Sequence, residues 1–96
     1  MRAWLKEPGQ PGHTVIIVDE LELLQQIVGG YIETVTLADD LVIICDEEGR
    51  LKEKPYNCNI AGIDFVGTIL AVGTEGCVFA SICDEAVEYL NEEAEG

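Results

Sequence analysis

The sequence predicts a single small α+β domain, in which one mostly antiparallel sheet carries two helices on one face. Its 96 residues fit one domain of ordinary size. Apolar residues make up 48% of the chain and charged residues 25%, as in globular proteins and unlike disordered or fibrous chains. Short β-rich runs follow one another through turns, which favours antiparallel pairing, and the predicted order of elements is β-β-α-β-β-β-β-α.

The first two strands are predicted at residues 2–7 and 13–18. The first run alternates loosely between apolar and polar residues, whereas the second is β-branched and apolar. Between them, residues 8–12 hold two prolines and two glycines, a composition typical of a loop.

A helix is predicted over residues 20–28. Asp19 is expected to cap its N-terminus, with Glu22 three residues on as in a capping box. Apolar residues then recur at helical spacing and form one stripe: Leu21, Leu24, Ile27 and Val28. Gly29 is expected to end the helix in a left-handed conformation.

Two further strands are predicted at residues 31–37 and 41–45. The first alternates along its length, and the second is apolar throughout, as suits a central strand buried on both faces. Residues 46–49 form a tight turn, and residues 51–58 contain Pro55 and are expected to be irregular or an edge segment.

The last two strands are predicted at residues 65–72, interrupted by Gly67, and at residues 77–82. A second helix is expected to follow with Asp84 as its cap, and residues 91–96 form an acidic tail that is expected to fray. The predicted core comprises Leu24, Ile27, Val28, Ile43, Ile69, Val87 and Leu90.

The charge of the chain is the feature that says most about function. Nineteen acidic residues against five basic ones give a net charge of −14. This balance excludes direct binding to nucleic acid or to an anionic membrane surface, since both need clustered Lys and Arg. Residues 13–49 carry nine acids and residues 55–96 carry eight, with no Lys or Arg in either stretch. Such a surface is attracted to the basic groove of a protein that handles DNA or RNA, although acidity can also serve solubility alone.

Three functions remain open from the residues. The first is an inhibitor whose carboxylates bind the basic surface of another protein or of a nucleoprotein complex. The carboxylates expected to do so are Asp39, Asp40, Asp46, Glu47, Glu48, Asp84, Glu85, Glu88 and Glu92. The second is a protein that binds or sequesters a small nucleotide signal, in a pocket formed by Tyr31, Glu33, Arg50, Lys52, Lys54 and Asn57. The third is a generic interaction module, acting as a monomer or a small homo-oligomer. The direction in which Arg50, Lys52 and Lys54 point distinguishes the second function from the others.

Catalytic and metal-binding patterns are missing from the sequence. Cys45 stands beside Asp46, whose charge opposes thiolate formation, and the single histidine, His13, supports no nucleophilic set. The gaps between the four cysteines are 12, 18 and 5 residues, without a C-x2-C pair. We therefore expect no enzyme activity, metal or cofactor. With no membrane span or secretory signal in view, the protein is expected in the cytoplasm, with all four cysteines reduced and mostly buried.

Several short motifs occur together along the chain: EPG at residues 7–9, VGGYIE at 28–33, CDEEGRLK at 45–52 with Pro55 and Asn57 after it, VGT at 66–68, and Val72-Gly73 with Phe79 downstream. In this combination the chain resembles a small family of phages, plasmids and Firmicute-type bacteria described as a domain of unknown function. It departs from that family's pattern between Asn57 and Val66, where relatives carry a longer helical stretch. The family offers no established catalytic residue to transfer. The resemblance implies an accessory protein of a mobile element, acting in the cytoplasm of a bacterial host cell. Such proteins often counter host defences such as restriction or CRISPR-type complexes.

Overall fold

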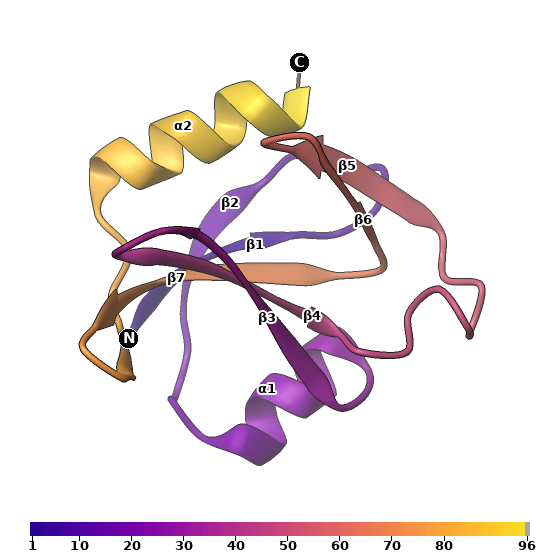
Figure 1. Cartoon of the computed structure of the whole chain (residues 1–96), viewed down its shortest axis with the longest axis horizontal. Coiled ribbons are helices and arrows are strands. Elements are labelled where there is room, and N and C mark those ends of the chain that lie inside the picture. The colour runs from indigo at the N-terminus through magenta and orange to yellow at the C-terminus, as the bar shows by residue number, and fades with distance from the viewer. Residues whose placement is uncertain (96) are drawn as a thin grey trace.

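A computed structural model describes residues 1–95 (Figure 1). Every strand pair within these residues is antiparallel, so the predicted α+β class with a mostly antiparallel sheet is confirmed. The elements are β1 (Arg2–Lys6), β2 (His13–Ile16), α1 (Leu21–Val28), β3 (Ile32–Ala38), β4 (Leu41–Asp46), β5 (Tyr56–Ile60), β6 (Ile63–Val66), β7 (Ile69–Glu75), β8 (Val78–Ala80) and α2 (Asp84–Glu95).

In the described part of the chain, six strands form one sheet with β7 in its middle. The spatial order is β2-β1-β7-β4-β3, and β8 pairs with the last residues of β7. Ala71 of β7 shows the central position of this strand, because it lies opposite Trp4 of β1 on one side and Ile43 of β4 on the other. A second, two-stranded sheet consists of β5 and β6.

The central strand β4 separates two apolar layers. All six of its residues are buried, as predicted for a strand covered on both faces. Leu41, Ile43 and Cys45 belong to the layer that contains Leu90 of α2. The other layer is formed by Ala3, Leu24, Val28, Val42, Ile44, Leu70 and Val72, where Leu24 and Val28 come from α1.

The two helices therefore lie on opposite faces of the sheet, as Figure 1 shows, and the expectation of both on one face is wrong. The physical reason lies in β4, whose apolar side chains point both ways and need a cover on each side. Within the predicted core, Ile27 and Val87 are only half-buried, and the other members are at most 2% exposed.

The β5–β6 hairpin was not foreseen. Residues 51–58 were expected to be irregular or an edge, yet Tyr56 begins β5, which pairs with β6. The single strand expected over residues 65–72 is also wrong, because Gly67 with φ 71° separates β6 from β7. The hairpin packs on the α2 side of the large sheet and contributes Cys58, Ile60 and Phe65 to that core.

Helix α1 begins one residue later than expected and ends where predicted. Its N-cap is Glu20, in extended conformation and without a side-chain capping bond, so the capping box of Asp19 and Glu22 does not form. Gly29 takes a left-handed conformation with φ 82°, and its N–H donates to the Gln25 carbonyl at 2.8 Å, which confirms the predicted C-terminal glycine.

Helix α2 continues to Glu95, so the frayed tail expected over residues 91–96 is wrong for 91–95; Gly96 lies outside the described residues. Asn91 accepts a hydrogen bond from Trp4 Nε1 at 2.8 Å, and Glu93 Oε1 accepts one from the Ala61 N–H at 3.0 Å. These contacts tie the second half of the helix to β1 and to the hairpin. Asp84 is the first helical residue and pairs with Arg2 at 2.7 Å. It is not the expected cap.

The cysteines divide into two groups. Cys45 and Cys58 are buried, as expected, whereas Cys77 and Cys83 are exposed because they lie in the β7–β8 turn and just before α2. Within residues 1–95, no helix has the length and apolar character that crossing a membrane requires.

Candidate functional site

Asp46, the last residue of β4, is the charged group around which the following loop is organised. Its side chain is only 1% exposed and forms ion pairs with Lys52 Nζ at 2.9 Å and with Lys54 Nζ at 2.6 Å. The two lysines also donate to the last carbonyls of α1, Lys54 to Val28 at 2.7 Å and Lys52 to Gly29 at 3.2 Å. Cations at a helix C-terminus are favourable because the unpaired carbonyls carry partial negative charge there.

Two sequence-based assignments are corrected by this geometry. Asp46 was expected on a partner-binding surface, but it is buried and already paired with two lysines. Lys52 and Lys54 were expected to hold an anionic ligand, but they bind Asp46 and the end of α1. In the sequence Asp46 looks like its neighbours, because residues 46–48 are all acidic. The lysines six and eight residues after Asp46 were the signal that could have indicated its ion pairs.

The ionisation of Asp46 follows from these contacts. Burial by itself raises the pKa of this carboxyl. The hydrogen bonds from Lys54 and Lys52, with one from the backbone N–H of Glu48, outweigh burial and lower the pKa from 3.8 to about 2. Asp46 is therefore charged throughout the physiological range.

The glycine pair after α1 belongs to the same structure. A Cβ on Gly30 would lie 2.6 Å from Asp46 Oδ1 and 2.6 Å from Lys52 Nζ, so a larger residue here would displace this ion pair. The motifs at residues 28–33 and 45–52 thus meet in space around the ion pairs of the buried Asp46. This contact gives both motifs a structural role.

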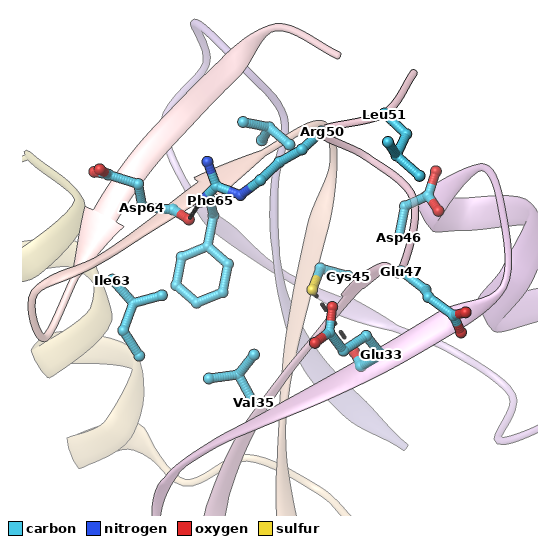
Figure 2. Close-up of a pocket in the computed structure, with 11 residues that line it drawn as sticks. Glu33, Val35, Cys45, Asp46, Glu47, Arg50, Leu51, Ile63, Asp64 and Phe65 are labelled. Atoms are coloured by element: carbon cyan, nitrogen blue, oxygen red, sulfur yellow. Dashed lines mark hydrogen bonds between the residues drawn. The ribbon is translucent and has the colours of Figure 1, made fainter. Parts of the chain in front are cut away.

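A cavity of about 220 Å³ lies between β3, β4, the loop after β4, and β6 (Figure 2). Val35 and Phe65 face each other across it, and carboxylates stand around its rim. The full lining is Glu33, Val35, Cys45, Asp46, Glu47, Arg50, Leu51, Ile63, Asp64, Phe65 and Val66.

Only two of the six residues predicted for a ligand pocket line this cavity. Glu33 and Arg50 line the cavity, whereas Tyr31, Lys52, Lys54 and Asn57 do not. Tyr31 is 67% exposed. Asn57 is buried in β5, and its Nδ2 donates to the carbonyls of Lys6 at 2.9 Å and Gly67 at 2.7 Å, so it holds the hairpin against β1.

The β6 wall of the cavity was missed by sequence reasoning, because residues 65–72 were predicted as one strand of the main sheet. Asp64 stands on this wall, and Arg50 Nη2 donates to its backbone carbonyl at 2.8 Å. Hydrogen bonds from Asn59 and Tyr56 hold the pKa of the Asp64 carboxyl below its ordinary value. The carboxylate at this part of the rim therefore stays charged.

Cys45 forms part of the cavity wall as a protonated thiol. Burial raises its pKa from 9.0 to about 11, and the charges of Glu33 and Asp46 add to the effect. Its Sγ donates weakly to the Glu33 carbonyl at 3.7 Å. At neutral pH the thiol is not a nucleophile. Within residues 1–95, no three His, Cys, Asp or Glu side chains are placed to hold a metal ion.

A second candidate surface lies at the other end of β3, which we call the acidic face. It brings together three segments: the β3–β4 turn, the end of β7 and the start of α2. Asp40 borders two shallow hollows, one shared with Glu85 and the other with Glu75. Thr74 anchors the turn, because its N–H donates to the Asp40 carbonyl at 3.2 Å and its Oγ1 to that of Asp39 at 3.0 Å. The acidic face comprises Asp39, Asp40, Glu75, Asp84 and Glu85.

Most of the predicted partner-binding carboxylates are exposed, but they do not form one surface. Asp39, Asp40, Asp84 and Glu85 belong to the acidic face, and Glu88 and Glu92 follow along α2. Glu47 and Glu48 lie beyond the opposite end of β3, after the pairing of Ile32 with Asp46. Glu75 was not foreseen as part of the surface, because only the pairing of β7 with β4 brings it near Asp40.

Comparison with known proteins identifies the family of the chain. Searches of curated proteins and of solved structures found no match. A family model described as a domain of unknown function, DUF3846, matches residues 1–95, nearly the whole chain. The resemblance to a family of unknown function is thereby confirmed, and the chain belongs to the DUF3846 family.

Proposed function

We propose that this protein is a non-enzymatic accessory protein of a phage or other mobile element. It binds the basic nucleic-acid site of a host restriction or CRISPR-type complex and so blocks that site. Its carboxylates stand where the phosphates of the nucleic acid would bind, and the acidic face is the surface that makes the contact.

The observation that carries this proposal is that each of the five basic side chains contacts an acceptor within its own chain. Arg2 pairs with Asp84, Lys52 and Lys54 pair with Asp46, and Arg50 donates to the Asp64 carbonyl. Lys6 is 7% exposed and its Nζ lies 3.5 Å from the Glu7 carbonyl. A net charge of −14 is therefore carried by a surface whose few cations are already engaged.

The arrangement of the carboxylates supports binding to a protein rather than solubility alone. The acidic face gathers charges from three segments that are far apart in sequence, and Arg2 is the cation paired within it, at 2.7 Å from Asp84. This ion pair is exposed, and exposed ion pairs contribute little to the stability of a fold. Complementary charge speeds encounter with a basic groove, and the attraction weakens as the Debye length falls from about 10 Å at 0.1 M salt to about 3 Å at 1 M.

Sequestration of a nucleotide signal is less well supported. The lysines that would bind its phosphates are held by Asp46, and the cavity places Arg50 among the carboxylates Glu33, Glu47 and Asp64. An anionic ligand would be repelled at that rim.

The test is capture from a host lysate at about 0.1 M salt, followed by elution with about 1 M salt or with duplex DNA. We expect a nucleic-acid-handling protein to be captured and then released by either treatment. One variant neutralises the acidic face with Asp39→Asn, Asp40→Asn, Glu75→Gln, Asp84→Asn and Glu85→Gln. A matched variant removes the same amount of charge elsewhere, with Glu7→Gln, Asp19→Asn, Glu20→Gln, Glu22→Gln and Glu53→Gln.

Loss of capture in the first variant and retention in the second would support the acidic face as the contact surface. Equal behaviour of the two variants would mean that overall charge alone is responsible. Capture that ignores both salt and DNA would contradict nucleic-acid mimicry.

A further inference from the structure

The long outer strand β3 leaves one of its edges without a partner in the described structure. It is the last strand in the order β2-β1-β7-β4-β3 and pairs only with β4 among residues 1–95. Its seven residues, IETVTLA, contain neither Pro nor Lys, the residues that commonly protect an edge from pairing with another chain. The bulge in its pairing falls late, between Thr36 and Ala38, so the strand is regular before that point.

The backbone groups that face outward can be assigned from the ladder. The Glu47 N–H donates to the Tyr31 carbonyl at 2.9 Å, so this pair is hydrogen-bonded. In antiparallel pairing such pairs alternate, which directs the backbone of Glu33 and Val35 toward β4. The N–H and C=O groups of Thr34 and Thr36 consequently point away from the sheet, and both residues are exposed.

Two other strand edges are shorter or already used. At the opposite edge of the sheet β2 has four residues. The β6 edge has its Asp64 carbonyl occupied by Arg50 at 2.8 Å. Of these three edges, β3 offers the longest run of available backbone groups.

The open edge of β3 borders the cavity described above. Val35 of β3 projects into it, and Ile63 and Phe65 of β6 form the facing wall, as Figure 2 shows. A strand added to β3 would place every second side chain on the same face as Val35. Those side chains would enter the cavity, while the backbone pairs with Thr34 and Thr36.

We propose that β3 accepts an extended segment of another protein as an additional strand, and that this segment carries both apolar and basic residues on the side that faces the cavity. Glu33 and Val35 are two residues apart on β3 and share that side. Main-chain hydrogen bonds to an exposed sheet edge provide affinity in this mode, and a pocket for alternate side chains provides selectivity. The apolar residues fit the cavity between Val35 and Phe65. The basic residues match the rim carboxylates of Glu33, Glu47 and Asp64, where Arg50 is the one basic residue.

This site goes beyond the proposed function, because it consists of the outer edge of β3 and the cavity beside it and includes no residue of the acidic face. It does not require the partner to handle nucleic acid. Experiments can reject the acidic face as a contact surface and still support strand addition at β3, or support the acidic face and reject strand addition.

The test titrates the isotope-labelled protein with a blocked decapeptide whose every second residue is in turn Lys and Val, with Thr at the positions between, at about 0.3 M salt to screen long-range attraction. Its Lys and Val side chains therefore lie on one face of the added strand. We expect binding with chemical-shift changes and slowed hydrogen exchange at the amides of Thr34 and Thr36. Thr34→Pro removes an outward N–H that β4 does not use, and should weaken binding by about two- to tenfold for each hydrogen bond lost. A peptide with Glu in place of Lys should not bind.

The matched control is Thr14→Pro on the opposite edge. Met1 and Ile17 exchange hydrogen bonds at 2.8 Å, so by the same alternation the Thr14 N–H also points outward, and its loss should leave binding unchanged. If Thr34→Pro does not fold, Glu33→Lys replaces it, with Glu22→Lys as its control. Equal weakening by a site variant and its control, unchanged exchange at Thr34 and Thr36, or no binding of the Lys peptide would each overturn the proposal.

Discussion

The two faces of the large sheet are covered in different ways. On one face a single helix, α1, packs Leu24 and Val28 onto the strands, and Lys52 and Lys54 close its end. On the other face α2 and the β5–β6 hairpin share the cover, and the cavity of about 220 Å³ remains between the hairpin and β3. The α2 face thus keeps a seam at this cavity, and we call the face under the single helix α1 the closed face. The proposed strand site lies in that seam.

The largest effect is expected from truncating one buried leucine under each helix. Leu24 is 2% exposed and Leu90 is 0% exposed, and a Leu→Ala change at such sites costs about 2–5 kcal/mol of unfolding free energy. We expect Leu24→Ala to cost more than Leu90→Ala, because the closed face relaxes less around the missing atoms. Urea denaturation of the two variants measures the difference. A larger loss for Leu90→Ala would contradict the description of the α2 face as the looser one.

A smaller effect is expected from Asp46→Asn, which removes the charge at the closed end of α1. The folded-state pKa of about 2 lies below the ordinary 3.8, so the charged carboxylate stabilises the fold above about pH 4 and this stabilisation is lost as the pH falls toward 2. We expect the variant to lose about 2 kcal/mol at pH 7, and the difference from the wild type to shrink toward zero near pH 2. Denaturation at several pH values measures it.

Glu47→Gln is the control for Asp46→Asn, because Glu47 is adjacent in sequence but exposed. Its unfolding free energy should stay within about 0.5 kcal/mol of the wild type at pH 7. A gap between Asp46→Asn and the wild type that persists unchanged at pH 2 would show that packing, not charge, explains the loss.

The smallest effect is expected on the acidic face. Asp39→Asn with Asp40→Asn should change the unfolding free energy by no more than about 0.5 kcal/mol, because both side chains are exposed. Asp84→Asn breaks the exposed pair with Arg2 at 2.7 Å and should cost at most about 1 kcal/mol. Thermal denaturation of both variants checks this. A loss as large as that of Asp46→Asn would assign the acidic face a structural role.

Periodicity in the sequence was enough to locate both helices and the buried strand β4. It did not show on which face each helix packs, because β4 is apolar in both directions and each helix can cover either side. The β5–β6 hairpin was hidden by Gly67, which was interpreted as an interruption within one strand. Its positive φ of 71° is a property of the folded backbone.

The candidate sites were harder to predict than the fold. Asp46 stands in a run of acids, and its burial depends on lysines that the sequence also allowed to face a ligand. The acidic face depends on Asp40, Glu75 and Glu85, which only the pairing of β4 with β7 and the docking of α2 bring together. Charge composition predicted an acidic surface, and tertiary structure decides where it is concentrated.

The central position of β7 has a consequence for how the chain folds during synthesis. The hairpins β1–β2 and β3–β4 are complete early in translation, but they join only through residues 69–75. Until β7 has left the ribosome, β1 and β4 each have one edge without a partner strand. Ile43 and Ile44 of β4 cannot yet be fully buried, because the core around them is incomplete. Closing the sheet then brings Trp4 beside Ala71, a contact between distant parts of the chain, and such contacts form slowly. We therefore expect the large sheet to close only after β7 has emerged, and the newly made chain to be prone to aggregation while the edges of β1 and β4 are unpaired.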